Sequence, residues 1–251
     1  MSAPTTSVGT MVSFTDAGVT FPGGTTALQH VSFDVDKGEF ISVVGPSGCG
    51  KSTLLRLASA LENVTEGSMT TSTDRIAYVF QDATLLPWRT VRENVMLLGE
   101  LDHMPKAERE RRCSESLEAV GLAGFEDHLP HQLSGGMKMR VSLARALTLE
   151  PELFLFDEPF AALDEITRER LGVELTALFA ERKFSGLFIT HSVSEAVYIS
   201  TKVVVMSGRP GTIVDEVEVP FAFPRDPGLR FTPEFVEIAE RVSLALQEAH
   251  S

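Results

Sequence analysis

An apolar segment at residues 40–44 leads without interruption into a glycine-rich loop, and this pairing restricts the fold more than any other feature. The loop reads Gly45-Pro-Ser-Gly-Cys-Gly-Lys-Ser52 and matches the pattern G-x-x-x-x-G-K-S/T. Glycines let the backbone curl so that successive N–H groups point inward, toward the oxygens of a phosphate group. Apolar residues then recur at helical spacing, at Leu54, Leu55, Leu57, Ala58 and Leu61. A strand, this loop and a helix in succession predict an α/β fold with a phosphate-binding site.

The loop also carries two side chains of predicted function. Lys51 should reach the β- and γ-phosphates of a bound nucleotide, and Ser52 should ligate Mg²⁺. The helix that begins here adds the partial positive charge of its N-terminus. The predicted phosphate-binding residues are Gly45, Pro46, Ser47, Gly48, Cys49, Gly50, Lys51, Ser52 and Thr53.

A second motif places two acids together at the end of another apolar segment. Residues 153–156 are followed directly by Asp157 and Glu158. We expect Asp157 to hold Mg²⁺ through water, and Glu158 to polarise an attacking water as a general base. Taken alone, the segment is equally compatible with a strand that ends in a polar turn. The phosphate loop upstream favours the catalytic interpretation.

Further short apolar segments, at residues 76–80, 187–189 and 203–206, alternate with helical patterns. One of these helices is predicted from Asp164, as its N-cap, to about Arg182. Such alternation predicts a mostly parallel sheet with helices on both faces. Four apolar segments lead into chemically important positions, namely Gly45, Gln81, Asp157 and His191. Because ligands bind beyond the carboxyl ends of parallel strands, we expect these four positions to share one site.

The chain is expected to form one domain at residues 11–251, preceded by a disordered tail at residues 1–10. Partly alternating apolar residues between 11 and 35 predict an N-terminal antiparallel β subdomain. Residues 92–150, rich in Glu, Arg, Leu and Ala, predict an inserted helical subdomain. Residues 11–91 and 151–220 would form the nucleotide-binding core, which ends in a hairpin turning at Gly208-Arg-Pro-Gly211. Residues 221–251 would form a C-terminal helical extension, with an amphipathic helix from Pro233 to Ala249.

The net charge of −13 argues against nucleic acid as a partner, because binding to a phosphate backbone needs a basic stripe. The densest basic cluster, Arg109, Arg111 and Arg112, alternates with acids and is interpreted as a solvated helix face. We expect neither a signal peptide nor a membrane helix, since no apolar run approaches the ~18–20 residues that a span needs. Cys49 lies inside the phosphate loop, which favours a reducing compartment.

A third motif, Leu133-Ser-Gly-Gly-Met137, precedes a segment of helical periodicity and is typical of a helix N-cap. Together with the phosphate loop upstream and the two acids downstream, it makes residues 11 to about 215 resemble the ATP-binding cassette (ABC) family. Three more motifs of that family stand in order, at Gln81 after Val79-Phe80, at Ala162-Leu163-Asp164, and at His191 in Ile189-Thr-His-Ser192. The resemblance implies a P-loop NTPase fold, with ATP and Mg²⁺ as cofactors and ATP hydrolysis as the activity.

The resemblance also implies roles for the matched residues. Nucleotide-binding roles fall to Ser134, Gly135, Gly136 and Asp164, the first three acting on ATP held by a second copy of the chain. Gln81 would sense the γ-phosphate and contribute to the Mg²⁺ site, and His191 would be the catalytic switch histidine. Phe21 would stack on adenine, with Phe14 as the alternative. The family's signature usually ends in glutamine where this chain has Met137, so phosphate contacts would come from Ser134 and the glycine N–H groups.

The partners implied by the resemblance are a second cassette, arranged head to tail as a homodimer, and integral membrane permease subunits. The permease contact would lie near residues 81–91, where Trp88 is either an interface residue or a core residue. A narrower resemblance is to cassettes of nitrate, sulfonate, taurine and bicarbonate importers. It lies in four segments, Leu85-Leu-Pro-Trp88, Gly135-Gly-Met137, Gly208-Arg-Pro-Gly-Thr-Ile-Val214 and Phe223-Pro-Arg225. It implies a substrate-binding protein as an indirect partner and a peripheral location on the cytoplasmic face of the inner membrane. Exporter or lipid-transport cassettes, soluble ABC proteins and binding-only modules are the alternatives.

Overall fold

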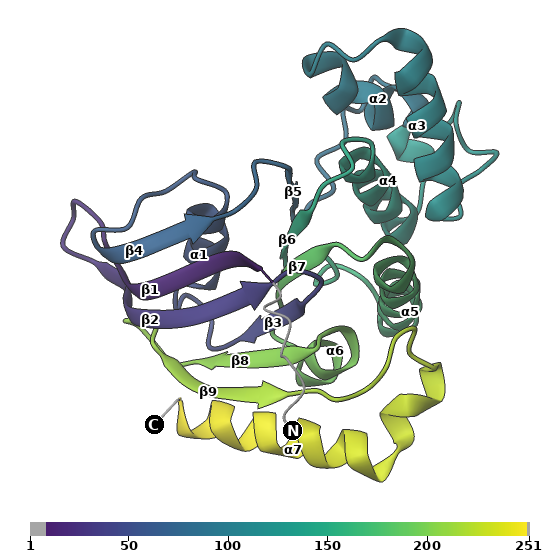
Figure 1. The fold of residues 1–251 in the computed structure, drawn as a ribbon. Coiled ribbons are helices and arrows are strands. Elements are labelled where there is room, and N and C mark those ends of the chain that lie inside the picture. The colour runs from purple at the N-terminus through teal and green to yellow at the C-terminus, as the bar shows by residue number, and fades with distance from the viewer. Residues whose placement is uncertain (1–8, 250–251) are drawn as a thin grey trace, which may run out of the picture.

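The structure, a computed structural model, describes residues 9–249 and contains two β-sheets and two groups of helices (Figure 1). The strands are β1 (Thr10–Thr20), β2 (Thr26–Asp36), β3 (Phe40–Val44), β4 (Glu66–Thr71), β5 (Ile76–Val79), β6 (Leu153–Asp157), β7 (Ser185–Ile189), β8 (Lys202–Met206) and β9 (Ile213–Glu218). The α-helices are α1 (Lys51–Ala58), α2 (Val91–Leu101), α3 (Lys106–Ala119), α4 (Gly135–Leu147), α5 (Glu165–Arg182), α6 (Val193–Ile199) and α7 (Pro233–Glu248). Two short 3₁₀ helices are η1 (Pro130–Gln132) and η2 (Pro227–Phe231).

Six strands form the larger sheet, in the order β5-β6-β7-β3-β8-β9. The first five run parallel, and β9 closes the sheet as an antiparallel partner of β8. β3 lies between β7 and β8, where Val43 pairs with Ile189 on one side and Val204 on the other. The predicted α/β fold with a mostly parallel sheet is confirmed. The carboxyl ends of β3, β5, β6 and β7 therefore lie along one edge.

A three-stranded antiparallel sheet of order β2-β1-β4 forms the predicted N-terminal β subdomain. Its third strand, β4, was not expected from the sequence. β4 pairs with β1 alone, and of its six residues only Met69 is half-buried. An edge strand that buries so little needs no apolar alternation, and so gives no sequence signal.

Two boundaries differ from those expected. β1 begins at Thr10, which pairs with Asp36, so the predicted tail ends before this residue. Residues 1–8 of that tail lie outside the described residues. α1 ends at Ala58, because Ala60 adopts a left-handed φ of 56°. Leu61, which the periodicity placed on this helix, is consequently 68% exposed.

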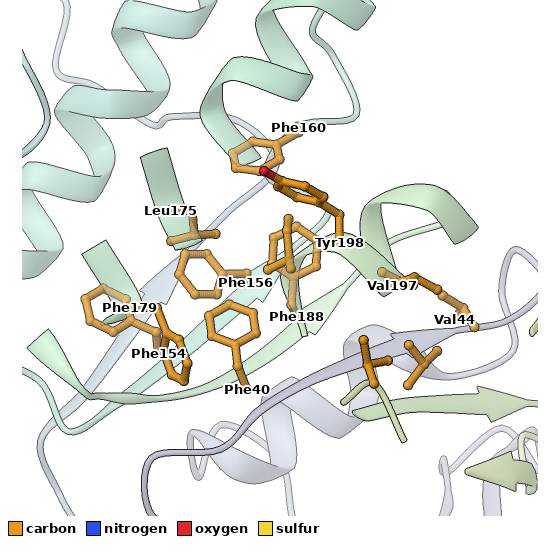
Figure 2. Close-up of a cluster of buried hydrophobic side chains, with 14 of the residues drawn as sticks. Phe40, Val44, Phe154, Phe156, Phe160, Leu175, Phe179, Phe188, Val197 and Tyr198 are labelled. Carbon is orange, nitrogen blue, oxygen red and sulfur yellow. The ribbon is translucent and has the colours of Figure 1, made fainter. Parts of the chain in front are cut away.

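An aromatic cluster fills the space between the central sheet and the helices that cover it (Figure 2). Phe40 on β3 lies at its centre, with its ring centroid 5.8 Å from that of Phe156 and 6.1 Å from that of Phe188. Gly186 on β7 pairs with Phe40, and a Cβ at this glycine would come within 2.6 Å of the Phe40 ring. The Phe40 ring therefore occupies the space that any side chain at residue 186 would need. This core packs against β3, β6 and β7, the strands whose carboxyl ends lead into Gly45, Glu158 and His191.

The inserted helices form a layer of their own, at the upper right in Figure 1. α2, α3 and α4 pack around a separate apolar cluster that includes Val95, Leu117, Val141 and Ala144. All four positions lie within residues 92–150, from which the insert was predicted. The helices therefore have their own core and connect to the sheet mainly through α4.

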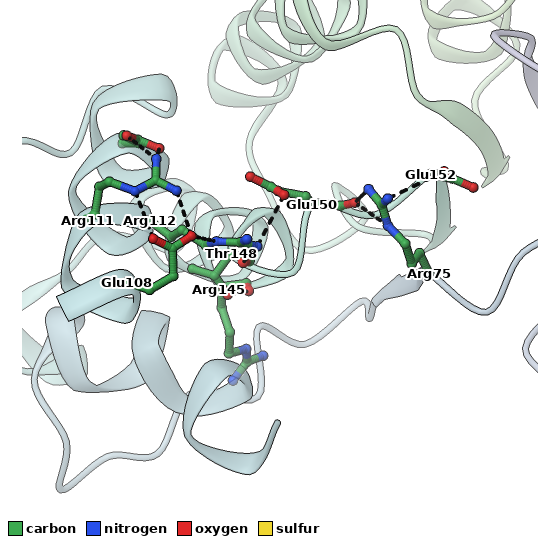
Figure 3. A network of polar contacts seen from close by, with 9 residues as sticks. Arg75, Glu108, Arg111, Arg112, Arg145, Thr148, Glu150 and Glu152 are labelled. Atoms are coloured by element: carbon green, nitrogen blue, oxygen red, sulfur yellow. Dashed lines mark hydrogen bonds and ion pairs between the residues drawn. The ribbon is translucent and has the colours of Figure 1, made fainter. Parts of the chain in front are cut away.

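The predicted basic cluster lies on α3 and is solvated only in part, because Arg111 is exposed whereas Arg109 and Arg112 are half-buried (Figure 3). Arg111 and Arg112 both donate hydrogen bonds to Glu108, at 2.6 Å each for the shortest contacts. These bonds lower the pKa of Glu108 to about 2. Arg111 and Arg112 are therefore already paired with acids.

The same network continues from the helical layer to the central sheet (Figure 3). Arg112 donates to the carbonyl of Thr148 over 3.1 Å and forms an ion pair of 3.3 Å with Glu150. Arg75, just before β5, donates to the carbonyl of Glu150 over 3.1 Å and pairs with Glu152 at 3.5 Å. These contacts fix the junction between α4 and the sheet.

The C-terminal segment packs α7 against β8, β9 and α6, and the predicted helix is confirmed. Before it, Arg225 is 3% exposed and caps the end of α6. Its guanidinium donates to the carbonyls of Val197 at 2.6 Å, Tyr198 at 2.8 Å and Ser200 at 2.7 Å. The ring of Phe223 lies 4.2 Å from the guanidinium carbon. The Phe223-Pro-Arg225 motif thus has a structural role in this chain.

Candidate functional site

The carboxyl edge of the central sheet borders a cavity of about 290 Å³. Its walls come from the end of β1, the start of β2, the phosphate loop, the residue after β6 and the turn between β8 and β9. The lining residues are Phe21, Thr25, Ala27, Ser47, Gly48, Gly50, Lys51, Ser52, Thr53, Glu158 and Arg209. We call this space the phosphate cavity, because the predicted phosphate-binding loop supplies most of its lining.

The phosphate loop is held in an open curve by its own lysine. Lys51 is buried, and its Nζ donates to the carbonyls of Gly45 over 2.8 Å and Pro46 over 2.9 Å. Gly50 has a φ of 111°, and a Cβ there would come within 2.7 Å of the Ala27 carbonyl oxygen. Glycine is therefore required at this position. α1 begins at Lys51 with no side-chain N-cap and no acid in its first turn, so its N-terminus can accept an anion.

Asp157 accepts hydrogen bonds from two side chains at the end of β6. Ser52 Oγ donates to Oδ1 over 2.9 Å, and the Tyr78 hydroxyl donates to Oδ2 over 3.0 Å. Burial, followed by the nearby charge of Asp157, raises the pKa of Tyr78, so this hydroxyl keeps its proton. The oxygens of Ser52 and Asp157 are the hard ligands that Mg²⁺ prefers. Within residues 9–249, no three His, Cys, Asp or Glu side chains are grouped to hold a metal.

Glu158 follows Asp157 in a left-handed conformation, with a φ of 47°. This conformation costs roughly 1–2 kcal/mol for a residue with a Cβ, and such strain concentrates at functional sites. The Glu158 N–H donates to the Ile189 carbonyl over 3.0 Å, which links β6 to β7 beyond the regular ladder. The carboxylate lines the phosphate cavity, and its Oε2 lies 3.3 Å from Nδ1 of His191. The acid and the histidine are thus brought together from two strand ends.

The turn that carries His191 is fixed by its two neighbours. The Ser192 N–H donates to Thr190 Oγ1 over 3.0 Å, and the Thr190 hydroxyl is hydrogen-bonded to the Glu195 carboxylate. Ser192 Oγ in turn accepts from the Glu195 N–H over 3.3 Å, capping α6. Burial raises the pKa of Glu195. These contacts fix the backbone of the turn that places His191 beside Glu158.

The remaining predicted nucleotide-binding residues lie in or beside a second hollow of the surface, which we call the signature groove. This groove has a volume of about 360 Å³ and is lined by Gln81, Asp82, Ala83, Gly135, Lys138, Met139, Pro159, Ala162 and Leu163. Ser134 and Asp164 cap the helices beside it, accepting from the N–H groups of Met137 over 3.3 Å and Thr167 over 3.0 Å. Both N-caps were predicted. None of Gln81, Ser134, Gly135, Gly136 and Asp164 lines the phosphate cavity.

Comparison with known proteins is decisive at this point, because residues 28–161 match the family described as ABC transporter. The chain belongs to the ABC transporter family. This cassette is 44% identical over 229 residues to an uncharacterised ABC transporter ATP-binding protein of Methanocaldococcus jannaschii, an alignment that covers 88% of the chain and 85% of the relative. It is 40% identical over 227 residues to the aliphatic sulfonates import ATP-binding protein SsuB 1 of Pseudomonas savastanoi pv. phaseolicola. That alignment covers 90% of the chain and 92% of the relative.

Solved structures give the same result for the cassette fold. The dimeric structure of a bacterial ABC transporter cassette is 31% identical, with a TM-score of 0.73, and covers 84% of this chain and 100% of its own. A second structure with the same values is described as a dimeric post-hydrolysis state of the ATP-binding cassette bound to ADP and Pi. Among residues 9–249 of this cassette, no helix is long and apolar enough to cross a membrane.

The structure distinguishes the two phenylalanines that the sequence left as alternatives. Phe14 is buried and stacks on Phe33, with ring centroids 4.8 Å apart. Phe21 is half-buried and lines the phosphate cavity. Trp88 is 73% exposed, so the alternative of a core tryptophan is wrong.

Sequence reasoning missed Tyr78, which contacts Asp157, and Arg209, which lines the cavity. Tyr78 precedes Gln81 by three positions, and the only available signal was a hydroxyl near the end of a strand. Its importance follows from the pairing of β5 with β6, which brings it to Asp157. Arg209 was assigned to a hairpin turn, and nothing in the sequence shows that this turn folds back onto the phosphate loop.

Proposed function

We propose that this cassette binds ATP with Mg²⁺ and hydrolyses it in a site completed by a second copy of the chain. One observation carries the proposal: the predicted nucleotide-binding residues are divided between the phosphate cavity and the signature groove. A single chain therefore presents two half-sites that do not meet. The dimeric arrangement described for the solved cassettes supports a head-to-tail pair, in which each cavity meets the groove of the partner.

In the proposed complex, the phosphates occupy the loop and the adenine stacks on Phe21. Lys51 and the first-turn N–H groups of α1 would bind the β- and γ-phosphates. Ser52 and Asp157 would hold Mg²⁺ together with phosphate oxygens, and Gln81 would join them when the two half-sites close. When bound, Mg²⁺ supplies positive charge that neutralises the transferring phosphoryl group.

Hydrolysis is assigned to Glu158, whose carboxylate lies on the cavity wall beside Ser52. It would accept a hydrogen bond from the attacking water and orient it toward the γ-phosphate, as a general base does. His191 Nδ1 lies 3.3 Å from this carboxylate and would hold it in place. Ser52, Glu158 and His191 come after the ends of β3, β6 and β7, so the sheet sets where these three side chains start.

The partner's half-site is assigned to the N-terminus of α4. Ser134 is exposed there, and the N–H groups of Gly135 and Gly136 belong to the first turn of the helix. Such a terminus attracts anions, and no acid lies in its first turn. Asp164 would contact the nucleotide from the adjoining N-terminus of α5. Met137 packs against the core of the helical layer, so its lack of hydrogen-bonding groups leaves these contacts intact.

We propose that the pair of cassettes drives the transport of a small anionic solute, of the nitrate, sulfonate, taurine or bicarbonate type. The sulfonate-import relative supports this class. The exposed Trp88, close to Gln81, offers an aromatic anchor for a membrane permease subunit. The cassette would then sit peripherally at the cytoplasmic face of the inner membrane, with a substrate-binding protein acting on the permease from the other side.

Replacing Glu158 with glutamine tests the proposed function. Glu158→Gln should lower the rate of phosphate release from ATP by about 10²-fold or more, because the water loses its base. ATP binding should persist, and size-exclusion chromatography with ATP should show a trapped pair. Glu234→Gln, an exposed acid at the start of α7, is the matched control and should leave the rate unchanged. Turnover by Glu158→Gln at the unsubstituted rate would contradict the assignment.

A further inference from the structure

The turn between β8 and β9, Gly208-Arg-Pro-Gly211, has no role in the site proposed above, yet it reaches the phosphate cavity. The guanidinium of Arg209 donates twice to the carbonyl oxygen of Gly48, from Nε over 3.1 Å and from Nη2 over 2.8 Å. Gly48 lies in the middle of the phosphate loop, and Arg209 itself lines the cavity.

The turn is built into the fold, so the position of Arg209 is set by the surrounding structure. The Gly211 N–H donates to the Ala27 carbonyl over 2.9 Å, and the Gln29 N–H donates to the Gly211 carbonyl over 3.0 Å. A Cβ at Gly211 would overlap the carbonyl oxygen of Cys49, so a glycine is needed for this close approach. The turn is thus wedged between β2 and the phosphate loop.

The positive charge of Arg209 is the second observation that points to a role in binding phosphate. The chain carries a net charge of −13, which opposes the approach of a polyphosphate. The charged residues that line the cavity are Lys51, Arg209 and Glu158. Lys51 donates to two carbonyls of its own loop. Arg209 thus supplies one of the two cationic groups available to a phosphate chain.

We propose that Arg209 is a further nucleotide-binding residue of this cassette, acting on the phosphate chain in two ways. Its two-pronged bond to Gly48 holds the phosphate loop in the open curve that the ligand needs. Its charge attracts the phosphates themselves, through the guanidinium donors that remain. This inference rests on the proposed function, because it assumes that the cavity holds a nucleotide.

The test measures dissociation constants for ATP, ADP and adenosine by competition with a fluorescent ADP analogue, in EDTA to prevent hydrolysis. We expect Arg209→Ala to weaken ATP and ADP about tenfold, as expected for the loss of a charge-assisted hydrogen bond, and adenosine less than twofold. Arg209→Lys keeps the charge but not the planar fork, and should recover part of the lost affinity. Arg241→Ala, an exposed arginine of α7, is the matched control and should bind all three ligands as the unsubstituted chain does.

Three results would overturn the inference. Unchanged ATP and ADP affinities in Arg209→Ala would show that the residue has no part in binding. Equal weakening of all three ligands would show a merely structural effect on the cavity, with no preference for phosphates. If Arg209→Lys recovered none of the lost affinity for ATP and ADP, the charge of Arg209 would have no part in binding. Failure of the unsubstituted chain to bind any of the three would instead overturn the proposed function, and this inference with it.

Discussion

The phosphate cavity and the signature groove differ in how firmly their polar groups are held. In the cavity, Lys51 and Asp157 are fixed by hydrogen bonds of 2.8–3.0 Å to neighbouring groups. Beside the groove, Ser134 is exposed and makes a single capping bond of 3.3 Å. A preorganised site can bind its ligand without a partner, whereas an exposed helix end offers too few contacts to retain one. We infer that nucleotide first binds in the cavity and that the groove contributes only when a second chain closes over it.

The largest effect is expected from a substitution that blocks the groove and leaves the cavity of the same chain intact. Ser134→Arg should leave ADP binding to the isolated chain unchanged, because the substitution lies outside the cavity. It should lower ATP turnover by about 10²-fold, since a bulky side chain at the N-terminus of α4 blocks the proposed contact with the partner's nucleotide. The two measurements are a binding isotherm with ADP and the steady-state rate of phosphate release.

Ser68→Arg provides the matched control for this substitution. Ser68 is an exposed residue of β4, in the antiparallel sheet, and the same change there should alter neither binding nor turnover. A Ser134→Arg chain that hydrolyses ATP at the unsubstituted rate would show that the groove has no part in catalysis.

A smaller effect is expected at Tyr78, beside the predicted Mg²⁺ site. Tyr78→Phe removes the hydroxyl that donates to Asp157 over 3.0 Å. The loss of one hydrogen bond to a carboxylate, about 1–1.5 kcal/mol, should raise the Mg²⁺ concentration for half-maximal turnover roughly fivefold to tenfold. The rate at saturating Mg²⁺ should change less, because Glu158 is untouched.

The second tyrosine of the chain is the control for the first. Tyr198 donates its hydroxyl to the Arg225 carbonyl over 2.9 Å, in the C-terminal part of the core and not in the cavity. Tyr198→Phe should lower the free energy of unfolding by a similar amount, yet keep the Mg²⁺ dependence of the unsubstituted chain. Equal Mg²⁺ dependence for both variants would contradict the positioning role of Tyr78.

Sequence reasoning worked best where one short pattern contains both the signal and its structural context. Phe40–Val44, the phosphate loop and the caps at Ser134 and Asp164 are such cases, because strand periodicity and N-cap preference act over a few neighbouring residues. β4 has no such pattern, since it buries almost nothing. Its existence follows from pairing with β1, which no local signal encodes.

Contacts between distant segments of the cavity could not be predicted in the same way. Arg209 and Gly48 are 161 positions apart, and Tyr78 and Asp157 are 79 apart. Both contacts depend on strand order, which brings β8 beside β3 and β5 beside β6. The Phe223-Pro-Arg225 motif shows the converse: the sequence marked it as distinctive, and only the buried contacts of Arg225 show that it caps α6.

The claim that two chains share each site is tested most directly by mixing chains that each lack one half. In a Glu158→Gln background, Lys51→Ala removes the phosphate contact and Ser134→Arg blocks the groove. The Lys51→Ala chain should bind ATP poorly, and the Ser134→Arg chain should bind it in a form that exchanges freely. Neither chain alone should therefore retain labelled ATP through a chase with excess unlabelled ATP. An equal mixture should retain one ATP per mixed pair, because one cavity and one groove remain intact together. Retention of ATP by either chain alone, or no retention by the mixture, would contradict the shared site.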